Sequence, residues 1–216
     1  MVAVIPLGDS SRRPRRFPLV TACIVALNVV GFALELMNGD AFIVRWSVVP
    51  ASILANQHWS TILTALFMHG SWSHIIGNML FLWAFGPEIE DSMGAPRYLL
   101  FYLLGGVVAT LAQIATTPAT TVPILGASGA IATVMGAFLV TYPRDKIRSI
   151  LLIFVFVRST YLPAALLIGV WFVTQFLSLG TVTRDAGGVA YAAHVGGFIF
   201  GAVTARLFEY RGVDSR

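Results

Sequence analysis

The stretch GASGA at residues 126–130 opens an apolar run that continues to residue 142, about the length of one membrane-spanning helix. Small residues on both sides of Ser128 let other backbone segments approach its hydroxyl. The first N–H groups of a helix have no partner within the helix, so they can hold negative charge that develops beside this serine. The pattern therefore fits a nucleophile, but a packing residue in an apolar helix fits it as well.

The composition indicates a membrane protein. Of the 216 residues, 57% are hydrophobic and 11% are charged, and the mean hydropathy is +0.81. A soluble domain carries about 25% charged residues, so the lipid bilayer is the expected solvent. The formal charge of +4 comes from arginines clustered at the ends of apolar segments. This pattern is typical of membrane orientation signals and argues against a nucleic-acid-binding face.

Apolar segments predict six membrane spans, at residues 19–37, 72–85, 98–116, 127–142, 163–179 and 189–208. The first span follows a basic segment, as a signal peptide would, but it is long and further spans come after it. An uncleaved transmembrane helix is therefore the favoured interpretation. The aromatic and apolar connection at residues 38–71 is predicted to associate with the membrane surface, and residues 150–157 to form an interfacial or re-entrant piece.

The predicted fold class is an all-α membrane protein, a bundle of six transmembrane helices with a membrane-associated first loop. The predicted domains are a cytoplasmic basic segment (1–18), a membrane domain (19–208) and a cytoplasmic tail (209–216). When the N-terminus is placed inside, only Arg45 and Arg184 of the fourteen lysines and arginines lie outside. The excess of positive charge on inner segments therefore predicts a cytoplasmic N-terminus.

Three polar residues on separate predicted spans lie at a similar depth in the membrane. His74 is near the start of the second span, Ser128 begins the fourth, and His194 lies about five residues into the sixth. All three spans start at the outer face, and a helix rises about 1.5 Å per residue, so the side chains differ in depth by about two turns at most. Ionisable groups inside a membrane are costly and usually mark function, so we expect a catalytic site here.

Small residues predict how the fourth and sixth spans approach each other. Gly197 and Gly201 follow His194 by three and seven residues and lie on nearly the same helical face. Ala132 and Gly136 repeat a small residue at a spacing of four on the fourth span. Such faces permit close helix packing, which would bring Ser128 to His194, although packing alone is the simpler explanation of the glycines.

Three sequence strings carry a resemblance to the rhomboid family of intramembrane serine proteases. They are HGSWSHIIGN at residues 69–78, GASG at residues 126–129 and AHVGG at residues 193–197. The resemblance extends from residue 16 to residue 208 and fits the minimal six-span bacterial form. Glu90 also matches an acidic position that the family has on the inner side.

The resemblance implies a serine endopeptidase whose Ser128 is the nucleophile and whose His194 is the general base. His74, Asn78 and the backbone N–H of Ser128 would hold the oxyanion, and His69 would be structural. The implied substrates are single-span membrane proteins cut near the outer face, with no cofactor and no metal. The implied location is the bacterial inner membrane.

Two positions depart from the pattern of the family. Trp59 is followed by serine where the family usually has arginine in the first loop, so loop anchoring is expected to differ. Ala132 stands four residues after the serine, where the family commonly has an aromatic residue that stacks on the catalytic histidine. We expect either a less rigid histidine or another aromatic residue in its place.

Three other functions fit parts of the sequence. A zinc site formed by His69, His74 and His194 is one alternative. However, the sequence has no carboxylate at the outer depth of the spans and no His-Glu-x-x-His string. A transporter or channel would fit six spans, but the sequence has no internal repeat. A non-catalytic rhomboid-like protein that binds or escorts membrane clients is the main alternative, although such relatives typically lose the serine or the histidine, and this chain has both.

Overall fold

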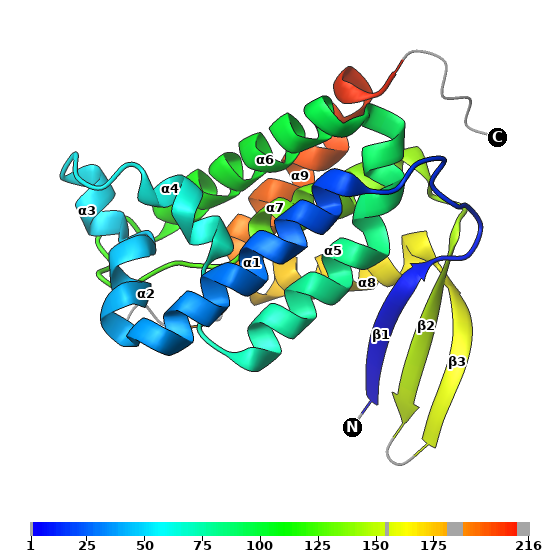
Figure 1. The fold of residues 1–216 in the computed structure, drawn as a ribbon, viewed down its shortest axis with the longest axis horizontal. Helices are drawn as coiled ribbons and strands as arrows, with labels where there is room; N and C mark the ends of the chain where they lie inside the picture. The colour runs from blue at the N-terminus through cyan, green and yellow to red at the C-terminus, as the bar shows by residue number, and fades with distance from the viewer. Residues whose placement is uncertain (1, 154–155, 181–187, 211–216) are drawn as a thin grey trace.

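The computed structural model describes residues 2–153, 156–180 and 188–210, which form a mainly helical bundle with a small sheet at one end (Figure 1). The longer helices are α1 (Leu19–Asn38), α5 (Trp72–Met93), α6 (Ala95–Thr116), α7 (Ser128–Thr141), α8 (Ala164–Leu177) and α9 (Tyr191–Phe208). The short helices are α2 (Asp40–Trp46), α3 (Pro50–Leu54), α4 (Thr61–Thr64), η1 (Ala65–Phe67) and η2 (Ser178–Gly180). The strands are β1 (Val2–Asp9), β2 (Lys146–Ile153) and β3 (Phe156–Pro163).

Each of the predicted spans overlaps one of the longer helices. Two of them, α1 and α6, are long and apolar enough to cross a membrane, and α7 and α8 are shorter apolar helices of 14 residues each. The α5 helix continues beyond the predicted end of its span at residue 85 and stops at Met93, before Gly94 with a φ of +74°. The positions of the helices therefore follow the apolar runs, while their ends follow the turn residues.

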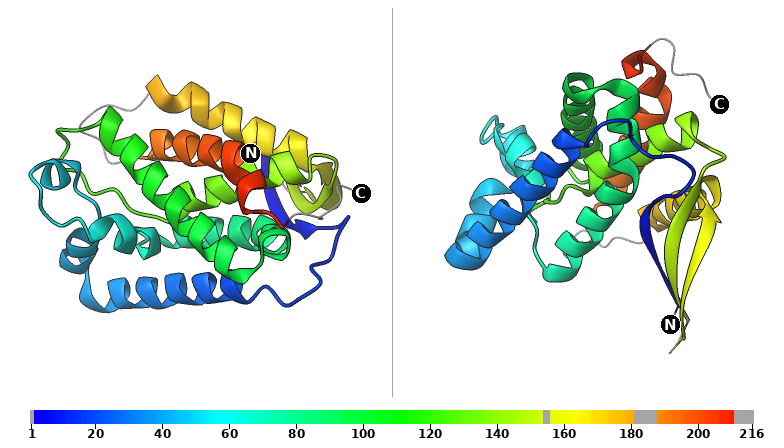
Figure 2. Two further views of the ribbon diagram at one scale, coloured as in Figure 1. Left: turned by 90° about the horizontal axis from the view of Figure 1, so that it is seen from above. Right: turned by 45° about the vertical axis from the view of Figure 1, so that its right-hand side comes forward.

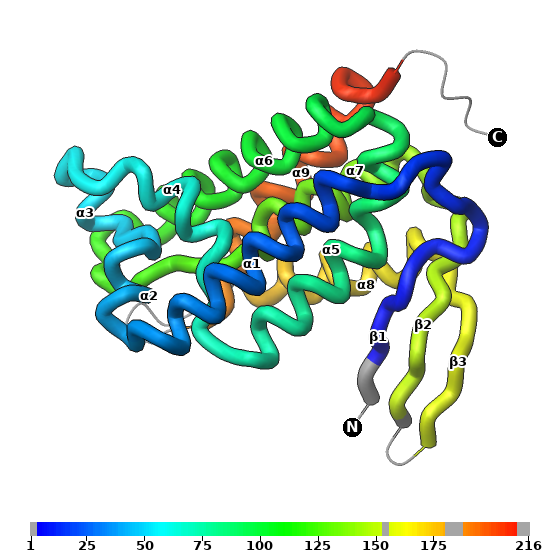
Figure 3. Tube along the Cα trace, viewed as in Figure 1, coloured from blue at the N-terminus to red at the C-terminus, as the bar shows by residue number. Residues whose placement is uncertain are grey.

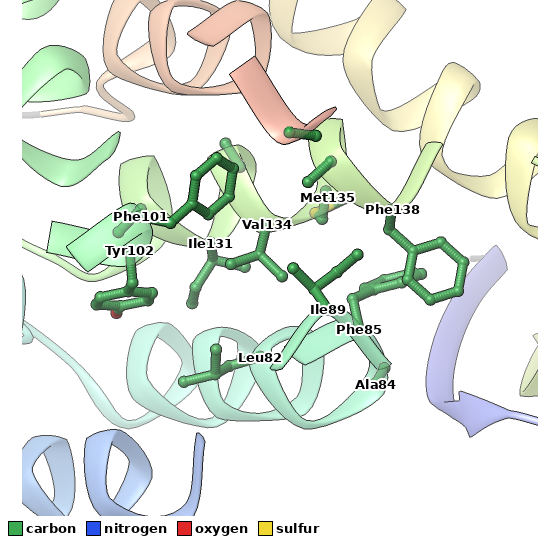
Figure 4. Packing of buried hydrophobic residues seen from close by; sticks show 14 of the residues in the cluster. Leu82, Ala84, Phe85, Ile89, Phe101, Tyr102, Ile131, Val134, Met135 and Phe138 are labelled. Atoms are coloured by element: carbon green, nitrogen blue, oxygen red, sulfur yellow. The ribbon is translucent and has the colours of Figure 1, made fainter. Parts of the chain in front are cut away.

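Helix α7 lies at the centre of the bundle and is buried on all sides. Every residue from 129 to 138 is buried, in agreement with an apolar sequence that has no polar face. Side chains from α5, α6 and α7 meet in the core, where Phe85 packs edge-on against Phe138 (Figure 4). Ser128 therefore begins a helix that is buried along most of its length.

Helices α7 and α9 touch through their backbones. A Cβ atom added to Gly197 would lie 2.2 Å from the carbonyl oxygen of Gly129, and one added to Gly201 would lie 1.9 Å from that of Thr133. The hydroxyl of Thr133 also donates a hydrogen bond of 3.0 Å to the Gly197 carbonyl. The close packing predicted for the fourth and sixth spans is therefore confirmed, and it leaves no space for a side chain at these glycines.

The first turn of α1 is held by a carboxylate from α5. Glu90 is buried, and its two oxygens accept the backbone N–H groups of Val20 and Thr21, each at 2.8 Å, as well as the Thr21 hydroxyl. These N–H groups have no acceptor within α1. A negative charge at this end of a helix also interacts favourably with the helix dipole.

We expect Glu90→Ala to lower the free energy of unfolding by about 1–3 kcal/mol, because the buried N–H of Thr21 and the partly buried N–H of Val20 lose their acceptor. Thermal unfolding in detergent measures the effect. Asp91→Ala is the control, since the hydrogen bond that Asp91 accepts from the backbone N–H of Arg15 is exposed. A Glu90→Ala protein as stable as the Asp91→Ala protein would mean that apolar contacts alone hold α1.

The first connection, residues 39–71, is folded into short helices and is fastened without the arginine that the family usually has. The backbone of Val48 pairs with that of Ile124, in the loop before α7. The Glu35 carboxylate accepts the backbone N–H of His69 at 2.7 Å. Trp59 is 54% exposed and its indole N–H donates to Asn56 within the same loop, so the side chain does not anchor the loop in the bundle.

The three strands correct the all-α prediction. Strand β1 pairs antiparallel with β2, and β2 with β3, so the first residues of the chain join a hairpin inserted between α7 and α8 (Figure 3). The apolar residues 150–157, expected to be an interfacial or re-entrant piece, form part of this hairpin where they are described. In β2, buried Ile147 and Ser149 alternate with exposed Lys146 and Arg148, which is the period of a strand.

The sheet is attached to α5 and to the start of α8. Strand β1 packs against α5, and β3 leads directly into α8 at Ala164, which is fully buried. The backbone N–H of Ala164 donates to the carbonyl of Asp145, just before β2. From this attachment the strands extend away from the helices (Figure 2).

Candidate active site

Ser128 is the first residue of α7 and is positioned by the turn before it. Gly126 has a φ of +118°, which is rare for any residue with a side chain. A Cβ atom at Gly126 would lie 2.7 Å from the His74 ring. The backbone N–H of Gly126 donates to the Ala65 carbonyl at 2.8 Å. A residue other than glycine would therefore move both the serine and the adjacent histidine.

His194 of α9 reaches this serine directly. Its Nε2 atom lies 2.7 Å from the Ser128 hydroxyl oxygen, and the side chain is 8% exposed. The contact depends on the close approach of α7 and α9, because Gly197, one turn after the histidine, lies against the backbone of Gly129, one residue after the serine. A serine and a histidine in this geometry are a nucleophile and a base within reach of one proton.

Helix α8 supplies two residues at His194 that the sequence analysis did not identify. The Nδ1 atom of His194 lies 2.7 Å from Oε1 of Gln175. The ring of Trp171 lies 5.6 Å from the imidazole, measured between centroids, at an angle of 38°. Trp171 thus lies beside the histidine, whereas Ala132 has no aromatic ring that could stack on it. The available signal was their spacing of four residues, which puts Trp171 and Gln175 on one face of an otherwise apolar helix.

His74, Asn78 and His69 form a second polar group beside the serine. Asn78 is 8% exposed, and its Nδ2 atom lies 2.9 Å from Nε2 of the fully buried His69. The rings of His69 and His74 meet edge-on with centroids 4.9 Å apart. His69, in the first loop, therefore connects Glu35 of α1 with Asn78 of α5, whereas His58 is exposed.

The predicted site residues meet in one cavity of about 630 Å³. Ser128, His194, His74 and Asn78 all line it, with walls from α5, α6, α7, α8, α9 and the segments before α7 and α9. None of the described residues that line the cavity is Asp, Glu, Lys or Arg. Proton transfer here would thus use neutral partners, and any negative charge would rely on N–H donors.

The remaining predicted residues lie outside this cavity. Gly197 and Gly201 form the contact between α7 and α9, and Glu90 lies near the opposite end of α5 from His74, where it holds α1. His69 is buried behind Asn78. The structure thus separates the four residues that a substrate could contact from those that hold the helices in place.

A family model described as the Rhomboid domain matches residues 56–211, more than half of the chain. The chain belongs to the rhomboid family. Rhomboids are integral membrane proteins, so the resemblance carried by the three sequence strings is confirmed, together with the membrane assignment made from composition. The match includes Ser128, His194, His74, Asn78 and every other residue that lines the cavity.

Several curated proteins are similar to this rhomboid. Rhomboid protease GluP of Bacillus subtilis is 32% identical over 126 residues, which cover 56% of this chain and 24% of that protein. The mitochondrial presenilin-associated rhomboid-like protein of Homo sapiens is 33% identical over 183 residues, or 82% of this chain and 45% of that protein. The presenilin-associated rhomboid-like protein of Bos taurus is 34% identical over 145 residues, which cover 66% of this chain and 36% of that protein. The chain spans less than half the length of each of these relatives.

Proposed function

We propose that this rhomboid is an intramembrane serine endopeptidase with Ser128 as nucleophile and His194 as general base. The observation that carries the proposal is the distance of 2.7 Å between the serine oxygen and Nε2 of the histidine, inside a cavity lined by amide and imidazole donors. The similarity to a protein named as a rhomboid protease supports it.

The geometry suits acyl transfer in two steps. His194 takes the hydroxyl proton as the Ser128 oxygen attacks the peptide carbonyl, and it then gives this proton to the departing amine. A water molecule, deprotonated by the same histidine, next attacks the acyl-enzyme. The bond to Ser128 breaks, the serine recovers its proton, and the new carboxyl end leaves.

The oxyanion of each tetrahedral intermediate would be held by N–H donors. Asn78 and His74 line the cavity beside the turn that carries the serine, and the backbone N–H of Ser128 has no acceptor within α7 because it begins the helix. Donors that are in place before the reaction stabilise developing charge without reorganisation.

We expect Asn78→Ala to lower kcat by about 10- to 1,000-fold, with the lower values reflecting the remaining donors. KM should change little, because the charge develops only in the transition state. Steady-state cleavage of a single-span substrate in detergent or liposomes separates the two constants. A raised KM with unchanged kcat would assign Asn78 to substrate binding.

The substrate class follows from the membrane setting. We propose six membrane-spanning helices, α1, α5, α6, α7, α8 and α9, with a cytoplasmic N-terminus as the distribution of arginines indicates. The site would then lie below the outer surface of a bacterial inner membrane. Single-span membrane proteins, cut near their outer end, are the proposed substrates.

The alternative is a rhomboid-like protein that binds or escorts membrane clients without cutting them. A fluorescent phosphonate that reacts with activated serines separates the two functions. Labelling that is present in the unmodified protein and lost in Ser128→Ala supports the protease. A folded protein that is not labelled and cleaves no model transmembrane substrate would favour the binding role.

A further inference from the structure

We infer that Gln175 is a positioning residue that completes a Ser128–His194–Gln175 triad, in which a neutral amide orients the histidine. This inference rests on the proposed serine protease function. The hydrogen bond from His194 Nδ1 to Gln175 Oε1 at 2.7 Å is its starting point.

The orientation of the Gln175 amide follows from its other partner. The Thr174 hydroxyl donates to the carbonyl of Trp171 at 2.6 Å, so its oxygen can only accept from the side chain that follows. The group that meets Thr174, at 3.2 Å, is Nε2 of Gln175, which is a donor. The amide oxygen must therefore be the atom that faces His194.

This orientation selects one tautomer of the histidine. Because Oε1 of Gln175 accepts only, the hydrogen of the neutral imidazole must reside on Nδ1. Nε2 then carries the lone pair and faces the hydroxyl of Ser128. This is the arrangement that a general base requires before it accepts the serine proton, and the opposite tautomer would place a hydrogen on the wrong nitrogen.

The surroundings explain why an amide is suitable in this position. None of the described residues that line the cavity is Asp, Glu, Lys or Arg, and an ionised group inside a membrane is costly. An amide fixes the tautomer without adding a charge that must be desolvated. Trp171, one turn earlier on α8, lies beside the same ring. Helix α8 therefore fixes both the position of the imidazole, through Trp171, and the nitrogen that carries its hydrogen, through Gln175.

Gln175 is placed to act through His194 rather than on the substrate. It is not among the residues that line the cavity, whereas Ser128 and His194 both are. A residue that contacted the substrate would affect KM. A residue that orients the base would instead affect every reaction that needs an activated serine, including reaction with a small phosphonate.

The test compares Gln175→Leu, Gln175→Glu and a control, Val173→Ala, at an exposed position on the same helix. We expect Gln175→Leu to lower kcat by about 3- to 10-fold, the effect of one lost hydrogen bond, with KM unchanged. Phosphonate labelling of Ser128 should slow by the same factor. Gln175→Glu keeps an oxygen that can accept from Nδ1 of His194, so it should recover most of the turnover. Val173→Ala should match the unmodified protein.

Three outcomes would overturn the inference, provided that thermal unfolding shows each variant to be folded. They are labelling of Gln175→Leu at the unmodified rate, a change confined to KM, and Gln175→Glu as impaired as Gln175→Leu. Failure of the protease function is distinct, because the unmodified protein itself would then show no labelling that depends on Ser128.

Discussion

Replacement of Ser128 or His194 by alanine is expected to abolish cleavage of a transmembrane substrate, with kcat reduced by about 10⁴- to 10⁶-fold. The two side chains share one proton across 2.7 Å, so the loss of either removes the activated nucleophile. Stability should change little, because both variants keep the glycine contacts between α7 and α9. Ser159→Ala in β3 and His58→Ala in the first loop are the matched controls, since both residues are exposed.

The double variant provides a further check on this pair. Ser128→Ala combined with His194→Ala should be no slower than either single variant, because residues that act as one unit have strongly non-additive effects. Cleavage is followed by gel and by mass of the products in liposomes. Activity near the unmodified level in either single variant would end the serine protease proposal.

Gly201→Val is expected to inactivate and destabilise the protein although residue 201 lies outside the cavity. A Cβ atom there would lie 1.9 Å from the carbonyl oxygen of Thr133, so helices α7 and α9 must separate. A displacement of about 1 Å between reacting groups can cost about 100-fold in rate. Gly201→Ala should also impair the enzyme, because the atom it meets belongs to the backbone and not to a flexible side chain.

Gly169→Ala is the matched control for this prediction. It makes the same substitution within α8, at a position where no atom lies within 4 Å of the added Cβ. Cleavage rate and thermal unfolding in detergent are measured for all three variants. Full stability and activity in Gly201→Val would contradict the backbone contact between α7 and α9, on which the approach of His194 to Ser128 depends.

The sequence was sufficient to predict the elements that depend on local patterns. Apolar runs located the longer helices, although α6 begins at Ala95, before the predicted start at residue 98, with Pro96 in its first turn. The relation between Ser128 and His194 could be inferred from matched depth and from the small residues beside them. These inferences needed only the helical period and the rise per residue.

Features that depend on contacts between distant segments could not be predicted in the same way. Strand β1 pairs Val4 with Leu151 in β2, and no local period connects residues so far apart. The apolar run at residues 150–157 was long enough to suggest a membrane piece, although a buried strand has the same composition. Gln175 was missed because its role depends on the rotation of α8 about its own axis, which an apolar sequence leaves undefined.

The sheet limits how the cavity can open. It connects the Met93 end of α5, through β1, with the start of α8, through β3, while the cavity lies between these helices near their other ends. In the proposed topology this connection holds α5 and α8 together at their inner ends, so an opening between them would form on the outer side. A substrate helix that widens this opening would tilt α8 and draw Trp171 and Gln175 away from His194. For the proposed protease, a tilt of α8 on substrate entry would therefore weaken the support of the base until α8 returned.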